Sequence, residues 1–285
     1  MSQEFATASG TSIQKDKRDV TAFSLLWKQQ LSPKLHYGIQ LRQEFVPTYK
    51  VPLLYALDAA YQWSKSNVLK ANYSKNFRVP SFNDLYWLGQ GNPDLLPEVS
   101  QQFSVSQNYE GEWATLRSSL FYIQTAQMIQ WRPNTNGIWR PANLRQAKNF
   151  GLEFFAKIET AIKESKWALE GEMAYTRAKD AISNHFLVYV PALSFRGRLA
   201  IKRKKWESYL GLRITDAVYT TTDNSKIMPS FSEMNAGLTY TFIQRKTMKN
   251  TIGLRVQNLA NQKYFLLPAR PAPNRNVTVQ LQINY

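Results

Sequence analysis

The residue types that could carry out chemistry are few and widely separated in this sequence. Cysteine is absent, which excludes disulfides and thiolate metal sites, and a total of only two histidines, His36 and His185, argues against a histidine metal cluster. Neither histidine lies near a nucleophile motif such as G-x-S-x-G, and no phosphate-, dinucleotide- or calcium-binding loop is present. The sequence therefore predicts no catalytic residue, no metal site and no cofactor, and we do not expect an enzyme.

Two groups of polar residues could in principle do more. Glu170 and Glu172 have the spacing of one strand face, where pairing with basic side chains is more typical than an acid/base couple. Asp223 and Asn224 could bind a cation, but their place in the polar segment 220–226 favours a solvated turn. We therefore assign neither group a catalytic or metal-binding role.

The chain is strongly basic, with 36 Lys and Arg against 20 Asp and Glu and a formal net charge of +16. Nucleic-acid-binding domains usually gather such charge on one face or one helix, whereas here it is spread along the chain. The densest run is KRKK at 202–205, where a hairpin turn is predicted. A solvated turn is the favoured interpretation, and contact with anionic lipid headgroups or with nucleic acid are the alternatives.

The elements that must position any functional residue are β-strands. Apolar residues recur at every second position through much of the chain, for example in 166–176, 193–202, 234–242 and 277–285. This period is typical of strands with one apolar face. No apolar run approaches the roughly 18 residues of a membrane helix, whereas a strand of a membrane β-barrel needs only about ten alternating residues.

Strand length separates a soluble sandwich from a membrane barrel. The alternating segments commonly run for about nine to twelve residues, longer than the roughly five or six of globular proteins, and this length suits a tilted strand that crosses a bilayer. Aromatic residues make up 13% of the chain, enough for the girdles at two membrane interfaces. The expected fold is all-β: an antiparallel transmembrane β-barrel, of which this chain supplies roughly 12–13 strands. Short turns are expected at 31–33, 64–66, 110–112 and 162–165, and long loops at 79–100, 132–149, 177–191, 215–229 and 258–276.

The most specific motif spans 76–107 and reads NFRVPSFNDLYWLGQGNPDLLPEVSQQFSVSQ. Its prolines cannot donate hydrogen bonds to a sheet, so they predict a rigid excursion between two strands. The motif resembles the signature of TonB-dependent receptors, in which a strand leads into an "FRaPsf" segment and then "GNPdLkPE"; a Pro-rich loop of no special kind is the alternative. The matching residues are Phe77, Arg78, Pro80, Leu85, Gly91, Asn92, Pro93, Asp94, Leu95, Pro97 and Glu98.

Later segments extend the resemblance. Residues 143–153 (NLRQAKNFGLE) resemble the start of a family strand, in which Gly151 suits a bulge or a close backbone approach. Residues 256–264 (VQNLANQKY) resemble another family motif through Asn258, Leu259 and Tyr264. The closing strand expected at 275–285 resembles the C-terminal signal read by the barrel assembly machinery. Its alternating residues are Val277, Val279, Leu281, Ile283 and the terminal aromatic Tyr285.

The resemblance covers residues 1–285 but only the later part of the family pattern. Complete members have a 22-stranded barrel preceded by a plug domain and a TonB-contacting box. The resemblance therefore implies that this chain is a C-terminal barrel fragment with the plug domain absent, and residues 1–20 indeed lack the apolar segment of a secretory signal. Alone, such a fragment would present two open β edges, which lipid cannot satisfy.

The resemblance also implies location in the bacterial outer membrane and TonB-dependent active import of a scarce nutrient, cobalamin or an iron-siderophore. Expected partners are the plug domain and N-terminal strands of the same receptor, the TonB complex through the plug, outer-membrane lipids, the barrel assembly machinery and the nutrient, with no nucleic acid. A passive outer-membrane channel and a soluble basic β protein that binds nucleic acid are the alternatives.

Family members contact their ligands through outer loops, the lumen wall and the plug. Aromatic and basic residues of the long loops are therefore the candidates for ligand contact, although a role in loop packing or in the interface girdle fits each of them equally well. These candidates are Tyr86, Trp87, Trp131, Arg132, Trp139, Arg140, His185 and Tyr219.

Overall fold

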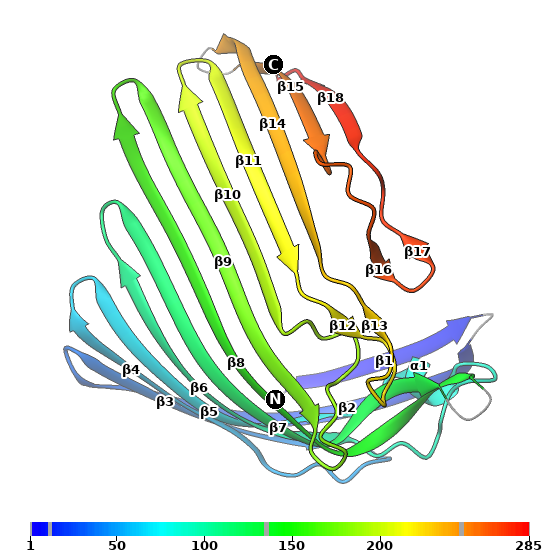
Figure 1. Ribbon diagram of the computed structural model, residues 1–285. Helices are drawn as coiled ribbons and strands as arrows, with labels where there is room; N and C mark the ends of the chain where they lie inside the picture. Colours follow the sequence, from blue (N-terminus) through cyan, green and yellow to red (C-terminus); the bar gives the residue numbers. More distant parts are fainter. Residues whose placement is uncertain (1, 11–12, 134–136, 245–247, 285) are drawn as a thin grey trace.

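The chain forms one large, curved antiparallel sheet whose long loops gather at one end (Figure 1). The computed structural model describes residues 2–10, 13–133, 137–244 and 248–284. The one helix in these residues is α1 (Phe82–Tyr86), and no described helix is long and apolar enough to cross a membrane. The expected all-β antiparallel fold is confirmed.

Fourteen strands make up the sheet, in an order that follows the sequence. They are β1 (Ser2–Gly10), β2 (Ile13–Ser32), β3 (Leu35–Phe45), β4 (Leu54–Ser64), β5 (Asn67–Arg78), β6 (Glu98–Glu110), β7 (Ala114–Pro133), β8 (Trp139–Ile162), β9 (Ser165–Asp180), β10 (Leu193–Arg203), β11 (Trp206–Thr215), β14 (Phe231–Gln244), β15 (Lys249–Gln257) and β18 (Asn276–Gln282). Two separate pairs lie in the connections: β12 (Val218–Tyr219) with β13 (Ile227–Met228), and β16 (Phe265–Leu267) with β17 (Arg270–Pro271).

Alternation along the strands gives the sheet one apolar and one polar face. On the apolar face, Leu199 lies opposite Leu169, and many large apolar side chains remain exposed. On the other face, Arg198 lies opposite Glu170. A cavity of about 1020 Å³ extends across several strands on the polar face, which is therefore the concave one.

Connections of different length gather at the two ends of the sheet (Figure 1). Turns of two or three residues at 33–34, 65–66, 111–113, 163–164 and 204–205 define what we call the turn end. Longer connections at 46–53, 79–97, 181–192, 216–230 and 258–275 define the loop end. The four short turns expected from the sequence are present, the first of them displaced to 33–34 because Leu31 and Ser32 belong to β2.

Strands such as β3, β5 and β10 have the expected nine to twelve residues, whereas others extend much farther. β8 has 24 residues, and β2 and β7 have 20 each. The segment 132–149, expected as a loop, is mostly strand because β7 and β8 stay paired as far as Pro133 and Trp139. Gly151 is paired in register without a bulge, and the ring of Phe121 lies where its Cβ would be, so a close approach is the observed case.

The N-terminal region adds strands that the sequence did not indicate. β1 and the first half of β2 pair with each other although 2–19 show little apolar alternation, since backbone hydrogen bonds are available to any residue type except proline. The sheet therefore has fourteen strands against the twelve or thirteen expected. In the strand order of the sheet, β1 and β18 are the two edges, as expected for an open part of a barrel.

Candidate functional site

An ion pair closes the base of the signature segment 79–97. Arg78 at the end of β5 and Glu98 at the start of β6 are direct cross-strand partners. The Arg78 guanidinium donates from Nε and Nη2 to the two carboxylate oxygens of Glu98, each at 2.7 Å. Glu98 Oε1 also accepts the backbone N–H of Ile129 at 2.6 Å. The pair therefore ties both ends of the segment to β7.

The carboxylate of Asp84 organises the helix inside this segment. Asp84 is 7% exposed, and its Oδ2 accepts hydrogen bonds from the backbone N–H and the hydroxyl of Ser81, while Ser81 Oγ accepts the N–H of Asp84. This capping box stabilises α1. Asp84 Oδ1 accepts the indole N–H of Trp131 at 2.8 Å. A buried carboxylate is stable only when hydrogen-bond donors surround it. The indole N–H of Trp131 therefore has a structural role in holding the segment.

A small apolar core lies beneath the segment. Leu85 and Leu95 pack against Ile129 of β7, and Leu95 and Pro80 are among the largest fully buried side chains. A Cβ on Gly91 would lie 2.5 Å from the carbonyl oxygen of Leu85, so only glycine fits at this bend. Burial of these side chains fixes the path of a segment that has little secondary structure of its own.

Side-chain amides attach the segment to β8. Asn143 Nδ2 donates to the carbonyl oxygen of Leu96, and Asn143 Oδ1 accepts the Leu96 N–H, both at 2.9 Å. Asn92 Nδ2 donates to the carbonyl oxygen of Pro141 at 3.1 Å. The segment is thus held on the outer part of the β7–β8 hairpin. Of the other signature residues, Phe77 lies in β5, and Pro93, Asp94 and Pro97 lie in the segment itself.

The β9–β10 connection contacts the opposite face of the same hairpin. Leu187 packs with Leu144, and Met128 lies against this cluster. Met128 is the cross-strand partner of Leu144, and Ile129 is the partner of Asn143. Successive pairs in a ladder face opposite sides. The loop-end part of the β7–β8 hairpin, around 128–129 and 143–144, is therefore packed between the signature segment and the β9–β10 connection.

The β9–β10 and β11–β14 connections are joined to each other. Asn224 Nδ2 donates to the carbonyl oxygen of Phe186 at 3.0 Å, and its Oδ1 accepts the Phe186 N–H at 2.7 Å. The ring of Phe186 stacks on Tyr219 with centroids 5.6 Å apart. Hydrogen bonds from Thr221 and Ser225 lower the pKa of Asp223 to about 2, so this carboxylate holds its own turn. The two connections form a single packed unit.

The third family motif forms the junction of β14 and β15 with the last long connection. Asn258, 2% exposed, donates to the carbonyl oxygens of Gln262 and Pro273 and accepts the Gln262 N–H, while Leu259 beside it is 37% exposed. Tyr264 Oη donates to Glu233 at 2.6 Å and its ring stacks on Phe231 at 4.2 Å.

These contacts change the acidity of Tyr264. Burial and the Glu233 carboxylate raise the pKa of Tyr264 to about 12. Glu233 also forms an ion pair with Arg213, whose Nη2 lies 3.4 Å from Oε2 of the carboxylate. The neutral phenol is therefore the form that this junction requires.

The predicted ligand-contact residues all lie at the loop end, but several have partners within the protein. Trp131 binds Asp84, Tyr219 stacks on Phe186 and Arg140 Nη2 donates to the carbonyl oxygen of Gly89. The ring of Tyr86 stacks on Phe82. Trp87 and Trp139 are 39% and 37% exposed, and Arg132 and His185 line one small cavity. Of the eight candidates, Trp87, Trp139, Arg140 and His185 are exposed, whereas Tyr86, Trp131, Arg132 and Tyr219 are partly buried.

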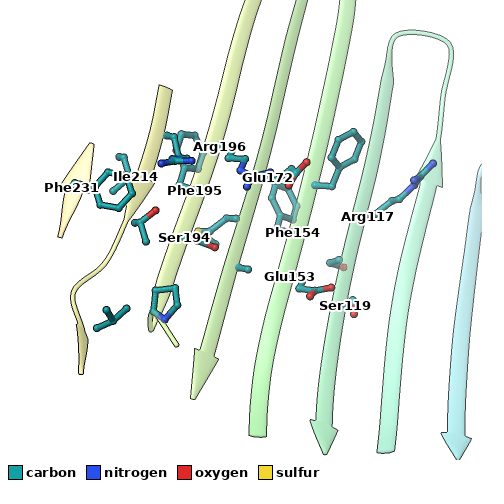
Figure 2. Close-up of a pocket in the computed structure, with 18 of the residues that line it drawn as sticks. Arg117, Ser119, Glu153, Phe154, Glu172, Ser194, Phe195, Arg196, Ile214 and Phe231 are labelled. Atoms are coloured by element: carbon teal, nitrogen blue, oxygen red, sulfur yellow. The ribbon is translucent and has the colours of Figure 1, made fainter. Parts of the chain in front are cut away.

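The concave face carries a further row of residues, of which the sequence singled out only Glu172, as a partner of basic side chains (Figure 2). They form one row of consecutive cross-strand partners from β7 to β14: Arg117, Phe155, Glu172, Arg196, Arg213 and Glu233. Five of these six line the cavity of about 1020 Å³, Glu233 being the exception. The signal in the sequence was the polar side chain at every second position of each strand. Acidic and basic groups in one wall suit a water-filled or protein-filled space.

The C-terminal signal residues lie on the edge strand β18. Val277, Val279 and Leu281 are partners of Val256, Leu254 and Ile252 on the apolar face, and Ile283 follows the strand. Tyr285 lies outside the described residues.

Comparison with known proteins agrees with this architecture. A family model described as "TonB dependent receptor-like, beta-barrel" matches residues 3–259. The vitamin B12 transporter BtuB of Photobacterium profundum is 24% identical over 260 residues, which cover 90% of this chain and 41% of that protein. BtuB of Vibrio vulnificus is 28% identical over 202 residues, which cover 68% of this chain and 30% of that protein.

Solved structures share the fold at low sequence identity. The copper transporter OprC superposes with a TM-score of 0.78 at 16% identity, covering 95% of this chain and 48% of OprC. The ferric enterobactin receptor PfeA of Pseudomonas aeruginosa superposes with a TM-score of 0.76 at 13% identity, covering 95% of this chain and 45% of PfeA. The chain thus spans less than half the length of these proteins. Because the family model matches most of its length, the chain belongs to the TonB-dependent receptor family and forms part of the receptor β-barrel.

Proposed function

We propose that this chain is the C-terminal part of an outer-membrane receptor that imports a scarce nutrient with energy supplied through TonB. The observation that carries the proposal is the match of residues 3–259 to the receptor barrel family, together with a loop end whose connections are held in one arrangement. The family consists of receptors and transporters rather than enzymes, which agrees with a sequence that lacks catalytic motifs.

Cobalamin is the first choice of nutrient, and an iron-siderophore is the second. Both curated relatives are vitamin B12 transporters, whereas the siderophore receptors are similar in fold at 13–16% identity. The exposed indoles of Trp87 and Trp139 offer flat apolar surfaces at the loop end that suit a corrin ring. Arg132 and Arg140 suit carboxylate or phosphate groups of either ligand.

The two faces of the sheet support a place in the outer membrane. The apolar face exposes Leu169, Leu199, Leu210, Leu238 and many similar side chains, which water disfavours and lipid accepts. The concave face would line the lumen and contact the plug domain of the complete receptor. Strands outside this chain would pair with β1 and β18, and the barrel assembly machinery would read Val277, Val279, Leu281 and Ile283 on β18.

Growth rescue tests the proposal. The full-length receptor is expressed in a cobalamin-requiring strain that lacks its own cobalamin receptor, with and without a functional TonB, and growth is titrated against cobalamin. Parallel strains test iron supplied as siderophores. Rescue that depends on TonB supports active import. Equal uptake without TonB would indicate the passive channel, and rescue by a siderophore alone would replace cobalamin as the nutrient.

A further inference from the structure

The turn end of the sheet carries a series of exposed lysines. The five described short turns contain Lys34, Lys65, Lys163, Lys204 and Lys205, which we call the turn lysines, against two acidic residues, Glu112 and Glu164. All five turn lysines are exposed. Lys204 lies 3.2 Å from Glu164, and among the described residues the other four have no carboxylate within ion-pair distance.

The turn lysines stand beside large exposed apolar side chains. Each of the five turns is flanked by or contains one: Leu31, Trp63, Trp113, Ile162 and Trp206, which are 63%, 56%, 61%, 54% and 49% exposed. The ring of Trp206 contacts that of its cross-strand partner Tyr240 on the apolar face, with centroids 4.6 Å apart and the planes tilted by 38°. Tryptophan and tyrosine in such a position are typical of the membrane–water boundary.

The order of these groups matches the layers of a phospholipid leaflet. Aliphatic side chains cover the apolar face, indole rings lie near the turns, and ammonium groups lie at the turns themselves, where lipid phosphates would be. Lysines in this place attract anionic headgroups. Nucleic acid fits the pattern less well, because the lysines are distributed over four turns along a curved rim, each beside a large exposed apolar side chain, rather than forming one basic groove.

We propose that the turn lysines bind the headgroups of anionic phospholipids in the leaflet at the turn end. This inference rests on the proposed function, because it requires the apolar face to lie in a membrane. It also assigns a role to the basic run at 202–205, whose last two residues are turn lysines. Lipid attraction should be strongest around the β10–β11 turn, where Lys204 and Lys205 are adjacent, and weakest at the acidic β6–β7 turn, which contains Glu112.

Lipid retention by the full-length receptor tests the proposal. The detergent-solubilised receptor is incubated with equimolar phosphatidylglycerol and phosphatidylcholine of identical acyl chains, and retained lipids are counted by native mass spectrometry. The quadruple variant Lys34→Gln, Lys65→Gln, Lys163→Gln, Lys205→Gln leaves the Lys204–Glu164 pair in place. Since one lysine at an anionic surface changes lipid preference by about fivefold, we expect the phosphatidylglycerol preference to fall by at least about tenfold in this variant.

A matched control removes the same charge at the other end. The variant Lys50→Gln, Lys148→Gln, Lys226→Gln, Lys263→Gln changes four exposed lysines at the loop end and should keep the preference. A wild-type receptor without preference for phosphatidylglycerol, or an equal loss in both variants, would overturn the inference while leaving import untouched. A receptor that transports normally but shows no such preference separates the two proposals, and failure to insert into any bilayer would overturn both.

Discussion

The indole Nε1 of Trp131 donates a hydrogen bond to Oδ1 of Asp84, which joins the outer end of β7 to the helix of the signature segment at 2.8 Å. The two residues are 47 positions apart in the sequence. Asp84 is nearly buried, and its other oxygen is taken by the cap of α1. The nearest basic group, Nη1 of Arg78, is 3.9 Å from Oδ2 of Asp84. The hydrogen bond from the indole therefore helps to stabilise the buried carboxylate.

We expect Trp131→Phe to loosen the signature segment without unfolding the barrel. The phenyl ring keeps much of the packing but leaves Asp84 Oδ1 without its donor, at a cost of about 1–3 kcal/mol. Faster limited proteolysis within 79–97 of the full-length receptor measures the effect. Trp139→Phe, in the same hairpin and 37% exposed, is the control, and equal proteolysis of both variants would contradict the assigned role.

Strand positions and their facing were predictable from the sequence because they depend on local alternation. Leu238 and Thr239, for example, fall on opposite faces as the pattern predicts. The excursion at 79–97 was predictable from its prolines. The partner of Asp84 was not, because it depends on how far β7 and β8 continue beyond the rest of the sheet, and polar residues such as Gln130 and Arg132 hide that extension.

The ligand candidates were chosen by residue type, and residue type does not show which side chains the loops use for themselves. Trp131 and Tyr219 are both engaged in loop packing. The charged row on the concave face was missed for a related reason. Arg117, Glu172 and Arg213 come together only through the combined register of four successive strand pairings, which no single stretch of sequence shows.

We expect Leu238→Arg to impair barrel assembly far more than Thr239→Arg. Leu238 lies opposite Leu254 on the apolar face, where an arginine near the bilayer midplane costs about 2–4 kcal/mol. Thr239 lies opposite Glu207 on the concave face, so an arginine there meets water and a carboxylate. The fraction of folded receptor in outer-membrane preparations, read from heat-modifiable gel migration, measures both. Similar losses in the two variants would show that the facing is wrong.

We expect Asn258→Ala to destabilise the connection between β15 and β18. The buried amide makes three hydrogen bonds with Gln262 and Pro273, and the residue has a φ of 49°, a conformation that asparagine tolerates better than alanine. Each backbone group left unsatisfied costs about 1–3 kcal/mol. Hydrogen exchange at 258–275 should accelerate. Asn261→Ala is the comparison, since Asn261 has a similar φ of 53° and its side chain makes one hydrogen bond, from the N–H of Arg275. It should accelerate exchange less than Asn258→Ala, and an equal acceleration would contradict the larger role assigned to the Asn258 amide.

Alkaline pH should weaken the junction between Tyr264 and Glu233. Burial first, and then the hydrogen bond to Glu233, raise the pKa of Tyr264 from 10.0 to about 12. A group whose pKa is raised by folding stabilises the folded state fully below its unfolded pKa and loses that contribution as the pH rises through the folded value. The stability supplied by Tyr264 is therefore present below pH 10 and lost as the pH approaches 12.

The variant Tyr264→Phe separates this ionisation from other effects of alkaline pH. It is already less stable at neutral pH, because it lacks the donor to Glu233, but it has no phenol to ionise. Chemical denaturation of the full-length receptor at a series of pH values should therefore show a smaller decline between pH 10 and pH 12 in Tyr264→Phe than in the wild type. Tyr122→Phe, on the apolar face, should follow the wild-type decline. A wild type and a Tyr264→Phe variant that lose stability in parallel over this interval would show that ionisation of Tyr264 is not what weakens the junction.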